Sequence, residues 1–159
     1  MNRSALAPLG LLALLAATAA AQAADSASGA VSLENVDFTV VDGLAFANRE
    51  GLAISLSSTD FDKQKMRKDG KVDIFDRMRH SGQVVSINID KGKPTMCVDY
   101  AFQEGDTASS GSYCETGVAD AVEITRLDDN RVAGSMNWNN GKDTTIEVTF
   151  DLAIEPDGK

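Results

Sequence analysis

Residues 131–154 read RVAGSMNWNNGKDTTIEVTFDLAI, and this stretch decides the fold. Its centre holds Asn140 and Gly141, the residue pair that a type I′ turn favours because both of its central residues adopt positive φ. Beyond the pair, Ile146, Val148 and Phe150 alternate with polar residues, which is the period of a strand with one buried face. The stretch therefore predicts a closing β-hairpin from Arg131 to about Ile154.

The same two-residue period recurs through most of the preceding chain. Short alternating runs are separated by turn residues at residues 36–40, 44–46, 52–56, 85–89, 95–102 and 118–126. Many short strands with such spacing favour an antiparallel β-sandwich or a small barrel. We expect a mostly β fold of about seven or eight strands, forming a single domain over residues 31–155.

One segment breaks the alternating pattern and predicts a short helical insertion near residues 59–80. Thr59 is suited to cap a first turn, and Gly70 is suited to end it. After that glycine, Val72, Phe75 and Met78 recur at three-residue steps, which places them on one helical face. We expect one or two short helices across the end of the sheet.

The first residues have the composition of a signal peptide. Arg3 precedes an uncharged run rich in leucine and alanine, and Ala21 and Ala23 are the small residues that signal peptidase requires. The predicted cut lies between Ala23 and Ala24, after which residues 24–30 would form a flexible leader. A transmembrane anchor is the alternative, but the apolar run is short and no basic stop-transfer cluster follows it. We expect a periplasmic or secreted protein.

The two cysteines, Cys97 and Cys114, predict a disulfide because an exported chain enters an oxidising compartment. Closing the loop between them would stabilise the fold by about 3 kcal/mol in the chain-entropy model. A redox-active pair would need a spacing such as Cys-x-x-Cys. A zinc site would need more ligands than two cysteines and His80, the one histidine.

The charge is strongly acidic, with 24 Asp and Glu against 15 Lys and Arg and a formal net charge of −9 at pH 7. Loss of Arg3 with the leader makes it one unit more negative. Nucleic acid and anionic lipid are therefore poor partners. The charge favours a cationic protein partner, or it serves solubility alone.

Catalytic and metal-binding motifs are scarce. His80 lies in no recognisable nucleophile and base motif. Two carboxylate pairs, Asp73 with Asp76 and Glu115 with Asp120, would suit a carboxylate-based hydrolase, although 24 acidic residues produce such pairs by chance. Spacing typical of calcium or copper sites is absent from the acidic turn at residues 128–130 and from the methionines Met66, Met78, Met96 and Met136. We predict no catalytic residue, cofactor or metal.

Charge segregation gives one candidate interaction surface. Seven basic residues gather within residues 59–80, and the later sequence is strongly acidic. A docking surface would consist of Lys63, Arg67, Lys71, Arg77, Arg79 and Trp138. Alternatively, these residues form a solvated helix face with intrahelical ion pairs, and Trp138 simply flanks the turn.

The run Arg131-Val132-Ala133-Gly134, followed by the turn and residues 147–152, resembles the closing hairpin of exported bacterial β-sandwich domains of unknown function. The resemblance implies a fold and transfers no catalytic residue. Our leading hypothesis is an exported, non-catalytic protein-binding domain, such as an inhibitor or immunity-type protein against a cationic envelope-active enzyme. The alternatives are a small-ligand or metal carrier of the periplasm and a carboxylate-based hydrolase.

Overall fold

The computed structural model describes residues 23–34, 36–47, 51–61, 82–104 and 107–155, and this part of the chain is mostly β. Its elements, in chain order, are β1 (Ser26–Leu33), β2 (Val36–Val40), β3 (Asp42–Ala47), β4 (Gly51–Ser57), β5 (Val84–Asp90), β6 (Lys93–Glu104), β7 (Thr107–Glu115), the 3-10 turn η2 (Ala119–Ala121), β8 (Val122–Leu127), β9 (Arg131–Asn139) and β10 (Thr144–Glu155). The mostly β prediction is confirmed, with ten strands in the described residues where seven or eight were expected.

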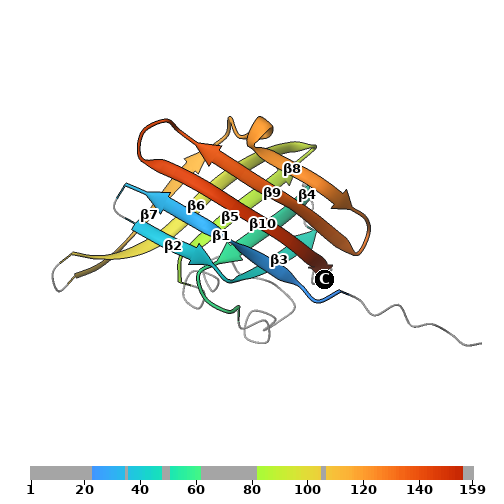
Figure 1. The fold of residues 1–159 in the computed structure, drawn as a ribbon, viewed down its shortest axis with the longest axis horizontal. Helices are drawn as coiled ribbons and strands as arrows, with labels where there is room; N and C mark the ends of the chain where they lie inside the picture. The colour runs from blue at the N-terminus through green and yellow to red at the C-terminus, as the bar shows by residue number, and fades with distance from the viewer. Residues whose placement is uncertain (1–22, 35, 48–50, 62–81, 105–106, 156–159) are drawn as a thin grey trace, which may run out of the picture.

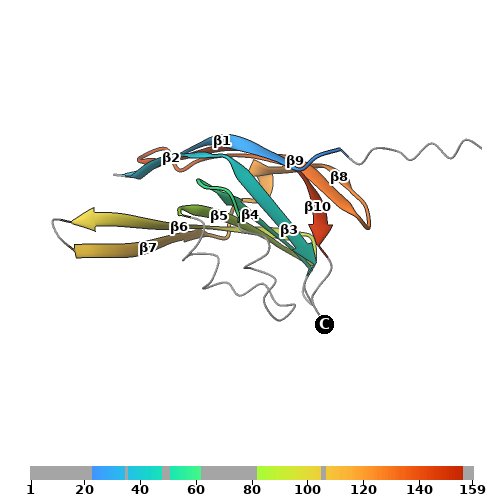
Figure 2. The same ribbon diagram turned by 90° about the horizontal axis from the view of Figure 1, so that it is seen from below.

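The strands form two layers that share β10 (Figures 1 and 2). The first layer has the order β2-β1-β10-β9-β8, and all its neighbours are antiparallel. In the second layer β3 to β7 follow one another as antiparallel neighbours. The end of β10 bends into the second layer, where Ile154 and Glu155 pair in parallel with β3. Strands of the two layers cross in Figure 1, as in packings where a corner strand switches sheets.

Alternating side chains place one continuous core between the layers. Its fully buried members come from both layers, and the largest are Ile54, Leu56, Ile87, Met96, Met136, Ile146 and Leu152. Burying each such side chain contributes about 1.5–3 kcal/mol. Met96 and Met136 are therefore core residues, as methionine packing predicts.

The predicted closing hairpin is present, and only its turn differs from the expectation. β9 and β10 pair from Ala153 with Arg131 to Thr145 with Asn139. Gly141 has φ of 73°, whereas Asn140 is not among the described residues with positive φ, so the type I′ prediction is wrong. The side-chain Oδ1 of Asn140 instead accepts hydrogen bonds from the N–H groups of Lys142, Asp143 and Thr144. This side-chain cap closes a four-residue loop.

The predicted leader is largely a strand. Residues 26–30 open β1, which lies between β2 and β10. Their serine, alanine and glycine residues resemble a linker, but Val31 and Leu33 continue the alternation into the core, and two neighbouring strands supply the backbone hydrogen bonds. Pairing with residues far along the chain overrides the local composition.

The predicted helical insertion lies largely outside the described residues, because residues 62–81 are not among them. Just before that gap, Phe61 packs against Leu44 and Phe46 on the side of β3 that faces away from the main core. The backbone N–H of Phe61 donates to Oδ2 of Asp42 at 2.8 Å.

The predicted disulfide is confirmed. Cys97 of β6 lies directly opposite Cys114 of β7, and their sulfurs are bonded at 2.07 Å. The bridge joins two neighbouring strands in register, which excludes both cysteines as free nucleophiles. Within the described residues no helix has the length and hydropathy of a membrane span.

Candidate binding face

The basic half of the predicted interaction surface cannot be placed, because Lys63, Arg67, Lys71, Arg77 and Arg79 lie outside the described residues. Trp138 can be placed. It lies on β9 opposite Ile146, is half-buried, and packs against the core between the layers. Its indole Nε1 is buried and has no hydrogen-bond partner in the described part of the chain. Trp138 thus faces the interior rather than an open docking surface.

Some of the candidate catalytic and metal-binding residues also lie outside the described residues, and others can be placed. Asp73, Asp76 and His80, with Met66 and Met78, fall outside the described residues. Oε1 of Glu115 accepts hydrogen bonds from the N–H groups of Thr116 and Gly117 at 3.1 and 3.4 Å, so it closes the turn after β7. Across the residues that the structure describes, no three His, Cys, Asp or Glu side chains are grouped to hold a metal ion. The hydrolase alternative stays a prediction.

The structure instead reveals a flat polar surface on the first layer, which we call the outer face. Along each strand, alternate residues point into the core and the others point away from it. The outer face is the part of this side away from the β8–β9 turn, and its outward positions are Ser28, Ala30 and Ser32 of β1, Asp37 and Thr39 of β2, Glu123 of β8, Ser135, Asn137 and Asn139 of β9, and Thr145, Glu147 and Thr149 of β10.

Short side chains keep the outer face flat and fix its polar groups. Oγ of Ser28 and Oγ1 of Thr149 lie 3.1 Å apart across β1 and β10. Nδ2 of Asn139 donates to Oγ1 of Thr145 at 3.3 Å across β9 and β10. Such cross-strand bonds hold hydroxyl and amide groups in place before any partner arrives.

The outer face has a hollow at Ala30, because that residue carries only a methyl group between Thr39 and Glu147, its neighbours on β2 and β10. The hollow is open and has a volume of about 420 Å³. Its rim includes the carboxylates of Asp37 and Glu147 and the hydroxyl group of Thr145. A partner side chain that enters it would meet acceptor groups on two sides.

The charge of the outer face has one sign. Asp37, Glu123 and Glu147 are exposed carboxylates at these positions, whereas the arginines on the same side of the layer, Arg126 and Arg131, lie beyond them near the β8–β9 turn, where each pairs with an aspartate. A sheet face of this kind attracts cations and repels anions over about a Debye length. The outer face thus contributes three carboxylates to the net negative charge of the sequence, and the two arginines on its side of the layer are already paired with aspartates.

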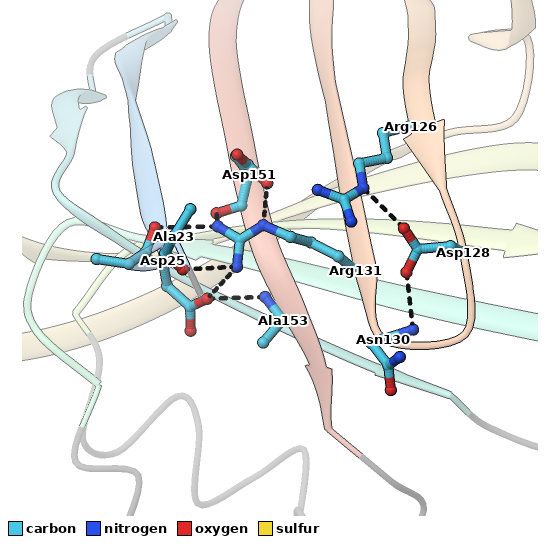
Figure 3. Close-up of polar contacts among 9 residues, drawn as sticks. Ala23, Asp25, Arg126, Asp128, Asn130, Arg131, Asp151 and Ala153 are labelled. Atoms are coloured by element: carbon cyan, nitrogen blue, oxygen red, sulfur yellow. Dashed lines mark hydrogen bonds and ion pairs between the residues drawn. The ribbon is translucent and has the colours of Figure 1, made fainter. Parts of the chain in front are cut away.

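A second polar feature, the Arg131 cluster, lies at one end of the same layer (Figure 3). The side chain of Arg131 is 6% exposed, and its Nε donates to Oδ1 of Asp151. Its terminal nitrogens donate to the carbonyls of Ala23 and Ala24, the carbonyl of Asp151 and Oδ1 of Asp25. Oδ1 of Asp25 also accepts from the N–H of Ala153 at 2.8 Å. The cluster fastens the start of the described chain to β9 and β10.

Two exposed turn carboxylates have lowered pKa values. The backbone N–H of Asn130 and then the guanidinium of Arg126 lower the pKa of Asp128 in the β8–β9 turn. The side chain of Asn140 and then that of Thr144 lower the pKa of Asp143 in the β9–β10 loop. The contacts that lower the two pKa values are also the contacts that close these turns.

Sequence reasoning did not identify the outer face or the Arg131 cluster. The signal for the face was present as serine, threonine and asparagine at alternate positions, but it becomes a surface only once the strand order is known. Comparison of the chain with protein-family models, curated proteins and solved structures found no match in any of the three. The resemblance of the closing hairpin to exported β-sandwich domains therefore stays a prediction.

Proposed function

We propose that the chain is an exported, non-catalytic binding protein whose outer face docks a cationic protein. The observation that carries the proposal is the arrangement of Asp37, Glu123 and Glu147 on one exposed face, while the arginines on that side of the layer, Arg126 and Arg131, are paired with aspartates near the β8–β9 turn. Complementary charge steers association and selects partners by sign. The leading partner class is a basic envelope-active enzyme, which such a protein would inhibit or neutralise.

The hollow at Ala30 supports a protein partner with a projecting basic side chain. A lysine or arginine has an apolar stem that can cover Ala30, and its charged end would reach the carboxylates of Asp37 or Glu147. The disulfide between Cys97 and Cys114 and the composition of residues 1–23 support export to the periplasm or beyond.

The test compares two variants with equal net charge. One neutralises the outer face through Asp37→Asn, Glu123→Gln and Glu147→Gln. The other neutralises exposed carboxylates elsewhere through Asp90→Asn, Asp120→Asn and Asp129→Asn. The partner is recovered from an envelope extract at low salt and purified, and its dissociation constant is measured for each variant. We expect about tenfold weaker binding for the first variant alone, or about 1.4 kcal/mol.

Equal loss in both variants would show that net charge, rather than the outer face, attracts the partner. A further variant, Ala30→Leu, fills the hollow without changing the charge and should also weaken binding. If binding survives all of these changes, the outer face is not the docking surface.

A small-ligand carrier is the second candidate, and the hollow is the observation that favours it. Its volume of about 420 Å³ lies within the range of small-molecule sites. Its lining is mainly apolar and carries the carboxylates of Asp37 and Glu147, which favours a cationic ligand with an apolar stem over an anionic one. Thermal-shift measurements with polyamines and sugars would separate this function from protein docking, since Ala30→Leu should then abolish a ligand-induced shift.

A further inference from the structure

Every N–H donor of the Arg131 guanidinium has an acceptor. An arginine side chain carries five N–H groups, and the contacts of Arg131 are one from Nε to Oδ1 of Asp151 and two from each terminal nitrogen. A buried arginine satisfied in this way is a built site rather than a chance surface pair.

Two of these acceptors lie at the place where the sequence predicts processing. The carbonyl of Ala23, which accepts from Arg131 at 2.9 Å, belongs to the peptide bond between Ala23 and Ala24. The carbonyl of Ala24 accepts at 3.0 Å. Asp25 adds its side chain to both Arg131 and the N–H of Ala153. The cluster therefore recognises residues 23–25 in particular, and β1 begins immediately after them.

The charges of the cluster are unequal in the uncut chain. Arg131 contributes one positive charge, whereas Asp25 and Asp151 contribute two negative charges at neutral pH. Hydrolysis of the bond between Ala23 and Ala24 adds one water, leaves a carboxylate on the departing Ala23 and produces an ammonium group on Ala24. That ammonium is positively charged at neutral pH, because an α-amino group has a pKa of about 7.7–8.0. Two cations then balance two carboxylates.

We propose that Arg131, Asp25 and Asp151 form a docking site for the processed N-terminus of this chain, which receives the ammonium of Ala24. The inference rests on the export part of the proposed function and is independent of the outer face. After processing, Ala23 no longer supplies a carbonyl, and the guanidinium keeps Asp25, Asp151 and the carbonyl of Ala24. In a chain that begins at Ala24 the cluster thus keeps four of the five acceptors and gains an ammonium group beside them.

The test uses recombinant chains with defined first residues, released from an N-terminal fusion that leaves no extra residue. One chain begins at Ala24, and the other begins at Ala21 and keeps the uncut peptide bond. Each is prepared with the native sequence, with Asp151→Asn, and with the matched control Asp128→Asn. The readouts are the urea midpoint of unfolding and the rate at which the α-amine reacts with an amine-specific reagent.

In the chain that begins at Ala24, Asp151→Asn should lower the urea midpoint more than it does in the longer chain. It should also speed labelling of the α-amine about tenfold, which corresponds to a pKa lower by about one unit. Asp128→Asn should have the same effect on the urea midpoint in both chains, and it should leave the labelling rate of the α-amine unchanged. Equal effects of Asp151→Asn in both chains, or a labelling rate unaffected by it, would overturn the docking site.

N-terminal sequencing of the protein recovered from its native envelope tests export separately. A chain that begins at Ala24 supports both the proposed export and the processed terminus. A chain that keeps residues 1–23 overturns export, and the labelling comparison still decides whether the cluster can receive an ammonium group.

Discussion

Two arginines of the first layer each donate from Nε to an aspartate (Figure 3). Nε of Arg126 lies 2.7 Å from Oδ2 of Asp128. Nε of Arg131 lies 2.5 Å from Oδ1 of Asp151. Their surroundings differ. The side chain of Arg126 is 54% exposed, and its aspartate belongs to the adjacent turn. The side chain of Arg131 is 6% exposed and joins three separate segments of the chain. Burial and the number of acceptors, rather than distance, decide what an ion pair contributes.

The largest expected effect comes from Arg131→Ala. It removes a buried cation and leaves the carbonyl of Ala24 and the carboxylates of Asp25 and Asp151 without a shared donor. We expect a loss of about 3 kcal/mol in the free energy of unfolding, at the low end for a broken buried pair because Asp151 is partly exposed. Urea denaturation measures this. The matched control, Arg126→Ala, should change stability by about 0.5 kcal/mol or less. Similar losses in the two variants would refute the comparison.

Arg131→Lys sharpens the comparison by keeping the charge and removing the planar fork. A lysine has three donors and cannot reach all five acceptors. We expect a loss of about 2 kcal/mol in the free energy of unfolding, from about two hydrogen bonds not replaced. Stability equal to that of the native protein would mean that charge alone holds residues 23–25 in place.

Asp25→Ala should have a smaller effect, because it removes one acceptor from Arg131 and the partner of the Ala153 N–H. We expect about 1 kcal/mol less stability and faster hydrogen exchange at the amide of Ala153. Asp37→Ala, on the exposed outer face, serves as the control and should leave that exchange rate unchanged. Unaltered exchange in Asp25→Ala would show that Asp25 does not hold the end of β10.

The smallest effect concerns the exposed turns and appears only in acid. Contacts in the folded protein lower the pKa of Asp128 and Asp143 from the ordinary value of 3.8. A lowered pKa means that the carboxylates add stability above pH 3.8, which is lost as the pH falls through their folded pKa values. The unfolding temperature should therefore fall less steeply between pH 5 and pH 2 in Asp128→Asn than in the native protein. An equally steep fall of the unfolding temperature in both proteins would contradict a stabilising role for the Asp128 carboxylate.

Most of the fold could be predicted from the sequence, because alternating apolar residues report directly on strands with one buried face. The closing hairpin, the core positions Ile146 and Val148 and the disulfide follow from local signals of this kind. Strands β1 and β7 could not be predicted, because their serine, alanine and glycine residues have the composition of loops. They are strands because β10 and β6 offer them backbone partners.

The candidate sites were less predictable because they depend on long-range register. Glu147 and Asp37 share the rim of one hollow only because β1 lies between β10 and β2. Arg131 was recognised as the start of a strand, yet nothing near it in sequence indicates that its partners are Ala23 and Ala24. Local patterns report which residues are buried, and only the strand order reports which polar residues meet.

If the chain is exported as proposed, the contacts of Arg131 would also set an order between processing and folding. The carbonyl of Ala23 gains its hydrogen bond only when Arg131, 108 residues later in the sequence, is in place. Under that proposal the bond after Ala23 would be accessible to a signal peptidase until β9 and β10 fold, because only then does Arg131 bind its carbonyl. Because Arg131 belongs to the last hairpin of the described residues, its contacts with Ala23 and Ala24 would form late, so that processing could precede them.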